Sequence, residues 1–362
     1  MKIFQSSVLN GILITSILRT ALKKIIKPLK IDMHFCVLGP RRAGKTTLLT
    51  AIYDSMNKMP IFDGKKYLLS VEQQTKLRLD EKLSQLKNLA NQISLFMKPD
   101  FPATSDCTKY CFSLGYSNLF DSKEKNLFLD TFFYDFPGGW LSPNTDDCSQ
   151  EEVDEIVAKS QVIIVPIDIP SLMEEEGIFF AKFNIRPDNL VDFFKRNFRK
   201  LKEPRLVILV PLRCEKYFYD AELRTEMVNK VREKYQKTER FFASEGQKDF
   251  INYAILPVCT LGNYVFHSIN NAKETVEFRY KKRSGKELYS PKNCDHLWLR
   301  IIFFMLRIFE DRDRYPQGLN VLKKVDELGN ILKTLKNDVV SIIPANSVIK
   351  ILQGNYISTE MD

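Results

Sequence analysis

Metal-binding and disulfide patterns are missing from this sequence of 362 residues. It has seven cysteines, no Cys-x-x-Cys pair, and three histidines that lie far apart, His34, His267 and His296. Structural zinc sites need closely spaced Cys and His ligands, so we do not expect one. An odd, irregularly spaced set of cysteines also argues against a disulfide framework. We therefore predict reduced cysteines in a cytoplasmic protein.

Apolar runs long enough for a membrane span are also missing at the amino end. The uncharged stretch over residues 3–18 contains several polar side chains and is shorter than the ~20 apolar residues of a span. It lacks the basic n-region and small-residue cleavage site of a secretory signal, and a basic run follows it. We predict a helical segment over residues 1–31. Docking on the next domain is favoured, and peripheral inner-membrane contact through residues 3–30 is the alternative.

The composition that remains is that of a globular protein with an aromatic core. The chain is 44% hydrophobic and 27% charged, with 26 Phe. No repeat or low-complexity segment interrupts it. The formal charge of +9 indicates affinity for polyanions or an acidic membrane face and says nothing of the fold.

Apolar runs that alternate with helical segments predict an α/β fold with a mainly parallel sheet and helices on both faces. We expect strands over 33–38, 127–134, 162–167, 205–212 and 251–258. We expect helices over 46–56, 151–160, 189–201, 221–243 and 296–312. A helical insertion over 72–96 and a β-rich insertion over 264–286 are added to this pattern. Residues 341–358 form either an edge hairpin or a partner-binding tail.

Residues 39–46, GPRRAGKT, match the phosphate-loop pattern GxxxxGK[ST] between an expected strand and an expected helix. The glycines let backbone N–H groups and the helix N-terminus face phosphate. Lys45 would reach the β- and γ-phosphates, and the Thr46 hydroxyl would bind Mg²⁺. We assign to nucleotide binding Gly39, Pro40, Arg41, Arg42, Ala43, Gly44, Lys45, Thr46 and Thr47.

A second motif, DFPG, follows the strand expected over 127–134. Asp135 at the end of that strand can hold Mg²⁺, and the backbone N–H of Gly138 can approach the γ-phosphate. This spacing is typical of a loop that is ordered by the third phosphate and released on its loss. We therefore count Lys45, Thr46, Asp135 and Gly138 as the catalytic residues.

The runs RRAGKTTLL, DFPGGWL, VPLRCEKY, LPVCTLG and SPKNCDHLW together resemble the double-GTPase families of bacterial conflict systems, relatives of the YcjX-like P-loop proteins. The resemblance covers residues 32–312, so we divide the chain into segment 1–31, a P-loop GTPase domain over 32–312, and a carboxyl-terminal extension over 313–362. It implies GTP or GDP with Mg²⁺, and a dedicated protein partner. It also places Thr104 in the first switch as a metal ligand beside Thr46 and Asp135, with Ser105 and Thr108 as competitors.

The base-recognition element is Leu212-Arg213-Cys214-Glu215, where a GTPase of this class has [NT]KxD. Glu215 can accept both N–H groups of a guanine edge, and Arg213 can lay a planar cation over the ring. The alternative is that these residues are only an exposed strand end. Cys259 and Thr260 would form the last loop around the base.

Gly139 and Trp140 stand where many GTPases have a Gln that orients the attacking water. A partner, or Arg41 or Arg42, would have to supply the missing group. We therefore expect a slow, partner-regulated GTPase switch, and the alternative is a P-loop ATPase or NTPase remodelling module. A kinase fits DFPGGW poorly. Nucleic-acid binding ranks lower and rests on two basic clusters, Lys195, Arg196, Arg199, Lys200, Lys202 and Arg205, and residues 279–286.

Overall fold

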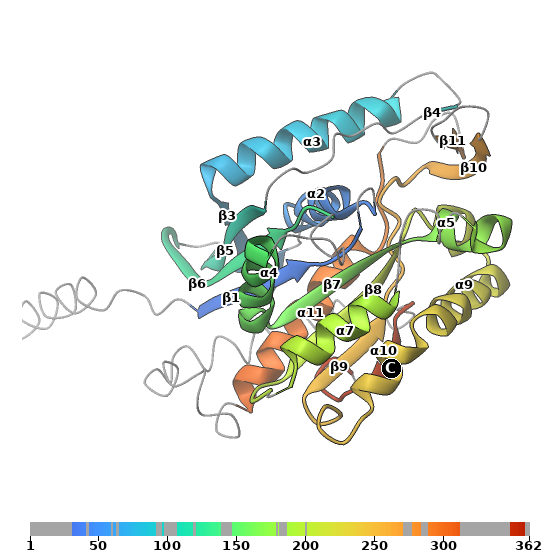
Figure 1. Cartoon of the computed structure of the whole chain (residues 1–362). Helices are drawn as coiled ribbons and strands as arrows, with labels where there is room; N and C mark the ends of the chain where they lie inside the picture. The colour runs from blue at the N-terminus through green and yellow to red at the C-terminus, as the bar shows by residue number, and fades with distance from the viewer. Residues whose placement is uncertain are drawn as a thin grey trace, which may run out of the picture.

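The chain is organised around a nine-stranded sheet with a three-stranded sheet beside it (Figure 1). The computed structural model describes residues 31–40, 43–58, 61–62, 65–91, 96–97, 107–118, 121–138, 147–178, 180, 187–199, 201–270, 277–283, 289–311 and 348–358. The predicted segment 1–31 lies outside these ranges except for its last residue, and so does most of the extension over 313–362.

Five parallel strands form the centre of the large sheet. In spatial order they are β9 (Ile251–Ile255), β8 (Arg205–Leu212), β7 (Val162–Asp168), β1 (Ile31–Val37) and β6 (Asp121–Asp135). Strand β1 pairs with β6 on one side and with β7 on the other, so the chain order reverses there. Ligands of such sheets bind beyond the carboxyl ends of the strands at this reversal.

Antiparallel strands extend both edges of this parallel centre. Strands β5 (Thr108–Asn118), β3 (Lys65–Val71) and β2 (Ile61–Phe62) continue the sheet beyond β6, and β12 (Lys350–Gln353) pairs with β9. The sequence patterns did not predict β2, β3 or β5. Of the two alternatives for residues 341–358, edge pairing is observed, as a single strand within the described residues.

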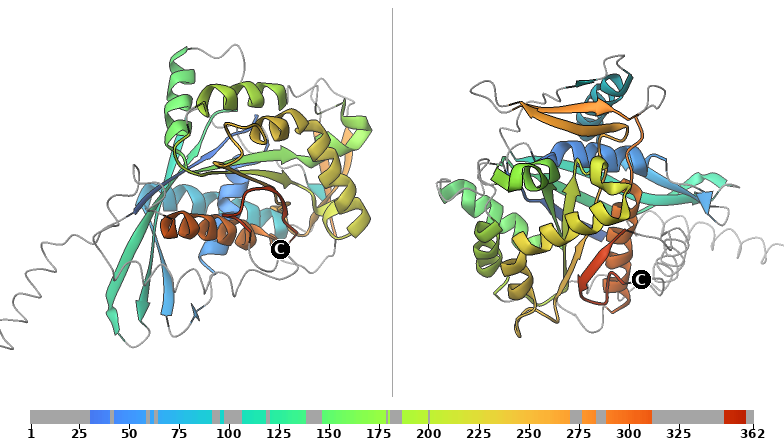
Figure 2. Two further views of the ribbon diagram at one scale, coloured as in Figure 1. Left: turned by 90° about the horizontal axis from the view of Figure 1, so that it is seen from below. Right: turned by 90° about the vertical axis from the view of Figure 1, so that its right-hand side faces the viewer.

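Helices cover both faces of the sheet, as predicted (Figure 2). One face packs against α2 (Lys45–Met56), α3 (Gln73–Asn91) and α11 (Cys294–Glu310). The other packs against α4 (Asp147–Lys159), α5 (Ile169–Met173), α7 (Pro187–Asn197), α9 (Ala221–Lys234) and α10 (Gln236–Phe242). Alternate residues of β1 reach opposite faces: Phe35 and Val37 join the first core, and Cys36 joins the second. The α/β fold with helices on both faces is confirmed.

The predicted β-rich insertion forms the small sheet, in the order β10 (Tyr264–Asn270), β11 (Glu277–Lys282) and β4 (Phe96–Met97). It lies beside the carboxyl end of α3, where the Tyr264 hydroxyl donates to the Leu89 carbonyl at 2.9 Å (Figure 2). The helical and β-rich insertions, far apart in the sequence, therefore meet.

Several predicted boundaries were wrong. The helix expected over 72–96 ends at Asn91, and Phe96 belongs to β4, because it pairs with a strand more than 180 residues away. The helix expected over 221–243 divides at Tyr235 into α9 and α10, with the Tyr235 ring buried in the core. Strand β9 ends at Ile255, so the strand expected to reach Val258 is shorter.

Candidate functional site

The phosphate loop joins β1 to α2 at the carboxyl edge of the sheet. Gly44 caps α2 with a φ of 88°, in the left-handed region that favours glycine. A Cβ atom on Gly44 would lie 3.2 Å from Cδ1 of Leu212 and 3.9 Å from Nη2 of Arg213. The predicted base-recognition element therefore directly adjoins the phosphate loop, although it lies about 170 residues further along the chain.

The Lys45 side chain folds back over this loop. Its ammonium donates to the Gly39 and Pro40 carbonyls, both at 3.0 Å, and the residue is 7% exposed. These carbonyls lie at the start of the loop and the ammonium comes from its end, so Lys45 closes the loop on itself. Charge-assisted bonds of this kind hold the ammonium where phosphate oxygens could replace the carbonyls.

Thr46 and Asp135, two of the predicted Mg²⁺ ligands, lie in contact beside Lys45. The Thr46 hydroxyl donates to Oδ2 of Asp135 at 2.7 Å, and Asp135 is fully buried at the end of β6, opposite Val37 of β1. Its other oxygen, Oδ1, is buried without a hydrogen-bond partner. Burial raises the pKa of Asp135, and the Lys45 charge and the Thr46 hydrogen bond only partly oppose this.

An orphaned carboxylate oxygen next to a hydroxyl fits a hard cation such as Mg²⁺, which takes oxygen ligands. Thr46 and Asp135 are the described residues that would hold it. Across the described ranges, no group of three or more His, Cys, Asp or Glu side chains could hold a metal ion by itself. Mg²⁺ usually binds through one or two carboxylates together with substrate phosphates and water, so this small donor set is sufficient.

Glu215 lies at the other end of the site, after β8. The residue is 1% exposed, and its Oε1 accepts the backbone N–H of Leu261 at 2.8 Å. Oε2 is buried and has no partner. Burial raises the pKa of Glu215 to about 7, against the opposing effect of backbone hydrogen bonds and of Arg213. Since Leu212, Cys214 and Glu215 are all buried, the alternative of an exposed strand end is wrong.

Asp168 is a site residue that the sequence patterns did not reveal. It ends β7, and its Oδ1 accepts from Nη1 of Arg213 at 3.2 Å, while its Oδ2 accepts from the Ser171 hydroxyl. Arg213 itself has a φ of 55°, uncommon for a residue other than glycine. Burial lowers the pKa of Arg213, but the Asp168 charge together with Tyr280 and Glu215 outweighs this effect, and the net shift is upward. Asp168 thus fixes the guanidinium between β7 and the phosphate loop. The sequence feature that could have revealed Asp168 is a single Asp at the end of an apolar strand.

Two loops that the sequence motifs paired are joined beside Glu215. Cys259 and Lys292 exchange backbone hydrogen bonds of 3.1 and 2.9 Å, and Nδ2 of Asn293 donates to the Pro257 carbonyl at 3.0 Å. A Cβ atom on Gly262 would lie 2.6 Å from the Ser290 carbonyl oxygen. The LPVCTLG and SPKNCDHLW runs therefore form one packed unit.

The remaining predicted residues fall into two groups. Ala43, Thr47, Gly138 and Thr260 lie within the described structure, and Cys259 is fully buried 3.9 Å (Sγ to Sγ) from Cys214. Arg41, Arg42, Thr104, Gly139 and Trp140 lie outside the described residues, so their predicted roles stay predictions. No helix in the described part of the chain is long and apolar enough to cross a bilayer.

The fold and this edge define a P-loop protein of the GTPase type. The reversal at β1, the phosphate loop, the Thr46–Asp135 contact and the buried Glu215 occupy one continuous edge of the sheet. A family model described as Double-GTPase 2 matches residues 35–249, more than half of the chain. The chain therefore belongs to the double-GTPase 2 family, as its motifs had suggested.

Solved structures show only distant likeness. The S. cerevisiae Ski7 GTPase-like domain bound to GDP and inorganic phosphate is 13% identical with a TM-score of 0.35, covering 67% of this chain and 46% of that chain. The Chaetomium thermophilum signal recognition particle receptor SRb-GTP/SRX complex is 12% identical with a TM-score of 0.34, covering 64% and 93%. The chain thus spans about half of the Ski7 chain. No curated protein sequence matches it.

Proposed function

We propose that the protein is a Mg²⁺-dependent GTPase that works as a slow switch read by a dedicated protein partner, in a bacterial conflict or defence system. The observation that best supports this proposal is a pair of carboxylate oxygens, Oδ1 of Asp135 and Oε2 of Glu215. Both are buried without a hydrogen-bond partner, on opposite sides of the phosphate loop. A buried polar atom without a partner costs about 1–3 kcal/mol, so each one favours a ligand that would satisfy it.

At the phosphate end, Thr46 and Asp135 would hold the cation, and Mg²⁺ would neutralise the charge that develops on the phosphates. Lys45 must leave the Gly39 and Pro40 carbonyls to reach phosphate, which exchanges two neutral acceptors for an anionic one. The loop N–H groups and the start of α2 add further positive potential.

At the base end, guanine offers N1–H and the exocyclic amine, which are two adjacent donors. The Glu215 carboxylate already has one oxygen engaged by Leu261, and its second oxygen is free to accept. Adenine presents an acceptor at N1, which an ionised Glu215 would repel. Because Leu212 replaces a polar residue of the usual pattern, we expect a GTP preference of roughly ten- to a hundredfold, set by ~1–3 kcal/mol.

The switch is expected to turn over slowly because the residues after DFPG, Gly139 and Trp140, have no group that can orient water. Even GTPases that have this Gln turn over on the order of 10⁻⁴ s⁻¹ when no arginine is supplied, and a partner-supplied group accelerates them by several orders of magnitude. The partner and the conflict role are proposed from the family resemblance and from this need for assistance.

The test is phosphate release from GTP by the full chain, with ATP and with EDTA as comparisons. We expect slow, Mg²⁺-dependent hydrolysis of GTP, reduced at least tenfold in Asp135→Asn, which keeps an acceptor for the Thr46 hydroxyl but loses the charge. Asp192→Asn is the matched control, because Asp192 is an exposed carboxylate on α7. Full Mg²⁺-dependent turnover by Asp135→Asn would remove that carboxylate from the mechanism. Equal hydrolysis of ATP and GTP would favour the NTPase alternative.

A further inference from the structure

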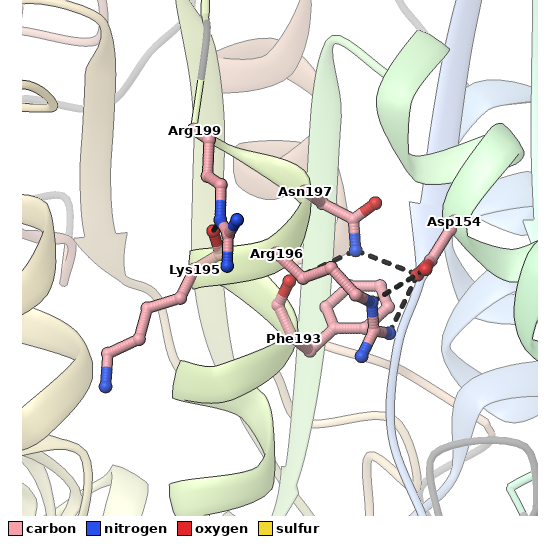
Figure 3. Close-up of polar contacts among 6 residues, drawn as sticks. All are labelled: Asp154, Phe193, Lys195, Arg196, Asn197 and Arg199. Atoms are coloured by element: carbon pink, nitrogen blue, oxygen red, sulfur yellow. Dashed lines mark hydrogen bonds and ion pairs between the residues drawn. The ribbon is translucent and has the colours of Figure 1, made fainter.

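The two basic clusters of the sequence differ in their surroundings. On α7, Arg196 forms two hydrogen bonds with Asp154 of α4, at 2.7 and 2.9 Å, and Asn197 donates to the same carboxylate (Figure 3). Lys195 pairs with Asp192 at 3.5 Å. Nε of Arg199 donates to the Lys195 carbonyl at 3.2 Å. This first cluster therefore helps to join α7 to α4, and its charge is partly neutralised within the protein.

The second cluster lies on the hairpin of β10 and β11. Arg279, Lys281 and Arg283 are exposed, while Tyr280 between them is fully buried. Alternate residues of a strand point to the same side about 7 Å apart, so Arg279 and Lys281 share the outer face of β11, and Arg283 continues the row one residue beyond the end of the strand. Within the described part of the chain, no ion pair joins any of them to a carboxylate.

An exposed aromatic ring lies at the end of this row. The Arg283 guanidinium lies 3.9 Å from the centre of the Tyr219 ring, and the Phe218 ring packs edge-on against it at 5.3 Å. Tyr219 is nevertheless 43% exposed, and Leu223 beside it on α9 is 37% exposed. The guanidinium covers one face of the Tyr219 ring, and the exposed part of the side chain is where a further planar group could contact the ring.

The hairpin is held firmly enough to act as a platform. Its inner face packs Phe266 against Tyr280 with ring centres 6.0 Å apart, and Tyr264 is bonded to α3. Both Tyr264 and Tyr280 belong to the main core of the protein. Arg279 and Lys281 can therefore be replaced without disturbing a buried contact.

We propose that this outer face, the row Arg279, Lys281 and Arg283 together with Tyr219, binds single-stranded nucleic acid. Proteins that bind single strands combine cations that follow the phosphates with aromatic side chains on which bases stack. A duplex keeps its bases stacked on one another and would leave Tyr219 unused. An acidic peptide could pair with the cations but has no planar group for the ring. The proposal goes beyond GTP hydrolysis and does not depend on it.

The test is fluorescence anisotropy of a labelled 15-nucleotide oligothymidylate with the full chain at several salt concentrations. Three phosphate contacts predict a slope of about −2 for log affinity against log salt, and Arg279→Ala with Lys281→Ala should bring it to about −0.7. Tyr219→Leu should weaken binding roughly five- to a hundredfold and leave the slope unchanged. The double variant Lys195→Ala with Arg199→Ala removes the same charge from α7 and should bind normally.

Four results would each overturn the proposal. The first is no binding of the oligonucleotide at low salt. The second is an equal loss of affinity in the α7 control variant, which would mean that only net charge matters. The third is duplex DNA binding as tightly as the single strand. The fourth is polyglutamate displacing the oligonucleotide equally well while Tyr219→Leu has no effect, which would indicate an acidic protein partner instead.

Discussion

The pH dependence of base discrimination is a direct consequence of the buried Glu215. The carboxylate form accepts both donors of guanine, whereas the protonated form can donate to the N1 acceptor of adenine. Because burial raises the pKa of Glu215 to about 7, both forms are populated near neutral pH in the free protein. The preference for guanine over adenine nucleotide should therefore rise with pH through neutrality.

The size of this effect follows from the titration. With a pKa of about 7, about nine tenths of Glu215 is ionised at pH 8 and about one tenth at pH 6. Guanine affinity should accordingly fall about tenfold between pH 8 and pH 6 while adenine affinity rises, so the guanine-to-adenine affinity ratio should fall by up to about a hundredfold. Bound guanine stabilises the carboxylate, so GDP binding near pH 7 should also release a fraction of a proton.

Competition binding of GDP and ADP over pH 6–8 measures this ratio. The two nucleotides carry the same phosphates, so phosphate titration cancels and the base contribution remains. Calorimetry in buffers of different ionisation enthalpy gives the proton release. The matched control is Glu215→Gln, which keeps the shape but cannot ionise, and its ratio should be small and independent of pH. A ratio that is constant with pH in the wild type, or that changes equally in Glu215→Gln, would refute the role of Glu215.

Three further predictions concern stability and the loops. Folding raises the pKa of Glu215 from 4.5 to about 7, so its contribution to the free energy of unfolding is fully present below pH 4.5 and is lost as the pH rises through about 7. In urea unfolding without nucleotide, the Glu215→Gln variant should lack this decline in stability. Lys45→Ala should weaken GTP binding at least ten- to a hundredfold by equilibrium titration while its circular dichroism stays native, and unchanged affinity would exclude the loop as the site. Gly262→Ala should lower the free energy of unfolding by about 1–3 kcal/mol, because its φ of 65° and the Ser290 backbone leave no room for Cβ; Gly246→Ala, with open space at its Cβ position, is the control.

The strands at the centre of the sheet could be predicted from the sequence because they are buried on both faces. Strands β7 and β8 are buried along their whole length, which the sequence records as continuous apolar runs. Strand β5 is different: Tyr110, Phe112 and Leu114 are buried, but the residues between them are not. Because β5 alternates buried and less buried residues in the antiparallel part of the sheet, it has no continuous apolar run, and the sequence patterns did not predict it.

Helix ends were harder to predict than helix existence. The division between α9 and α10 occurs where Tyr235 is buried in the core that also contains Phe242, within a segment that reads as one charged helix. The end of α3 depends in turn on β4 pairing with β11. Contacts between distant segments determine where these two helices end, and the local periodicity of the sequence does not reveal such contacts.

The sequence by itself determined the phosphate loop, the Asp135 motif and the family, because these depend on backbone conformation and residue order over a few consecutive positions. The tertiary structure alone decided that Asp168 holds Arg213, that Leu261 engages only one oxygen of Glu215, and that the Arg279 row is without carboxylate partners among the described residues. Desolvation and charge pairing depend on which distant side chains surround a group, and only the folded chain brings them together.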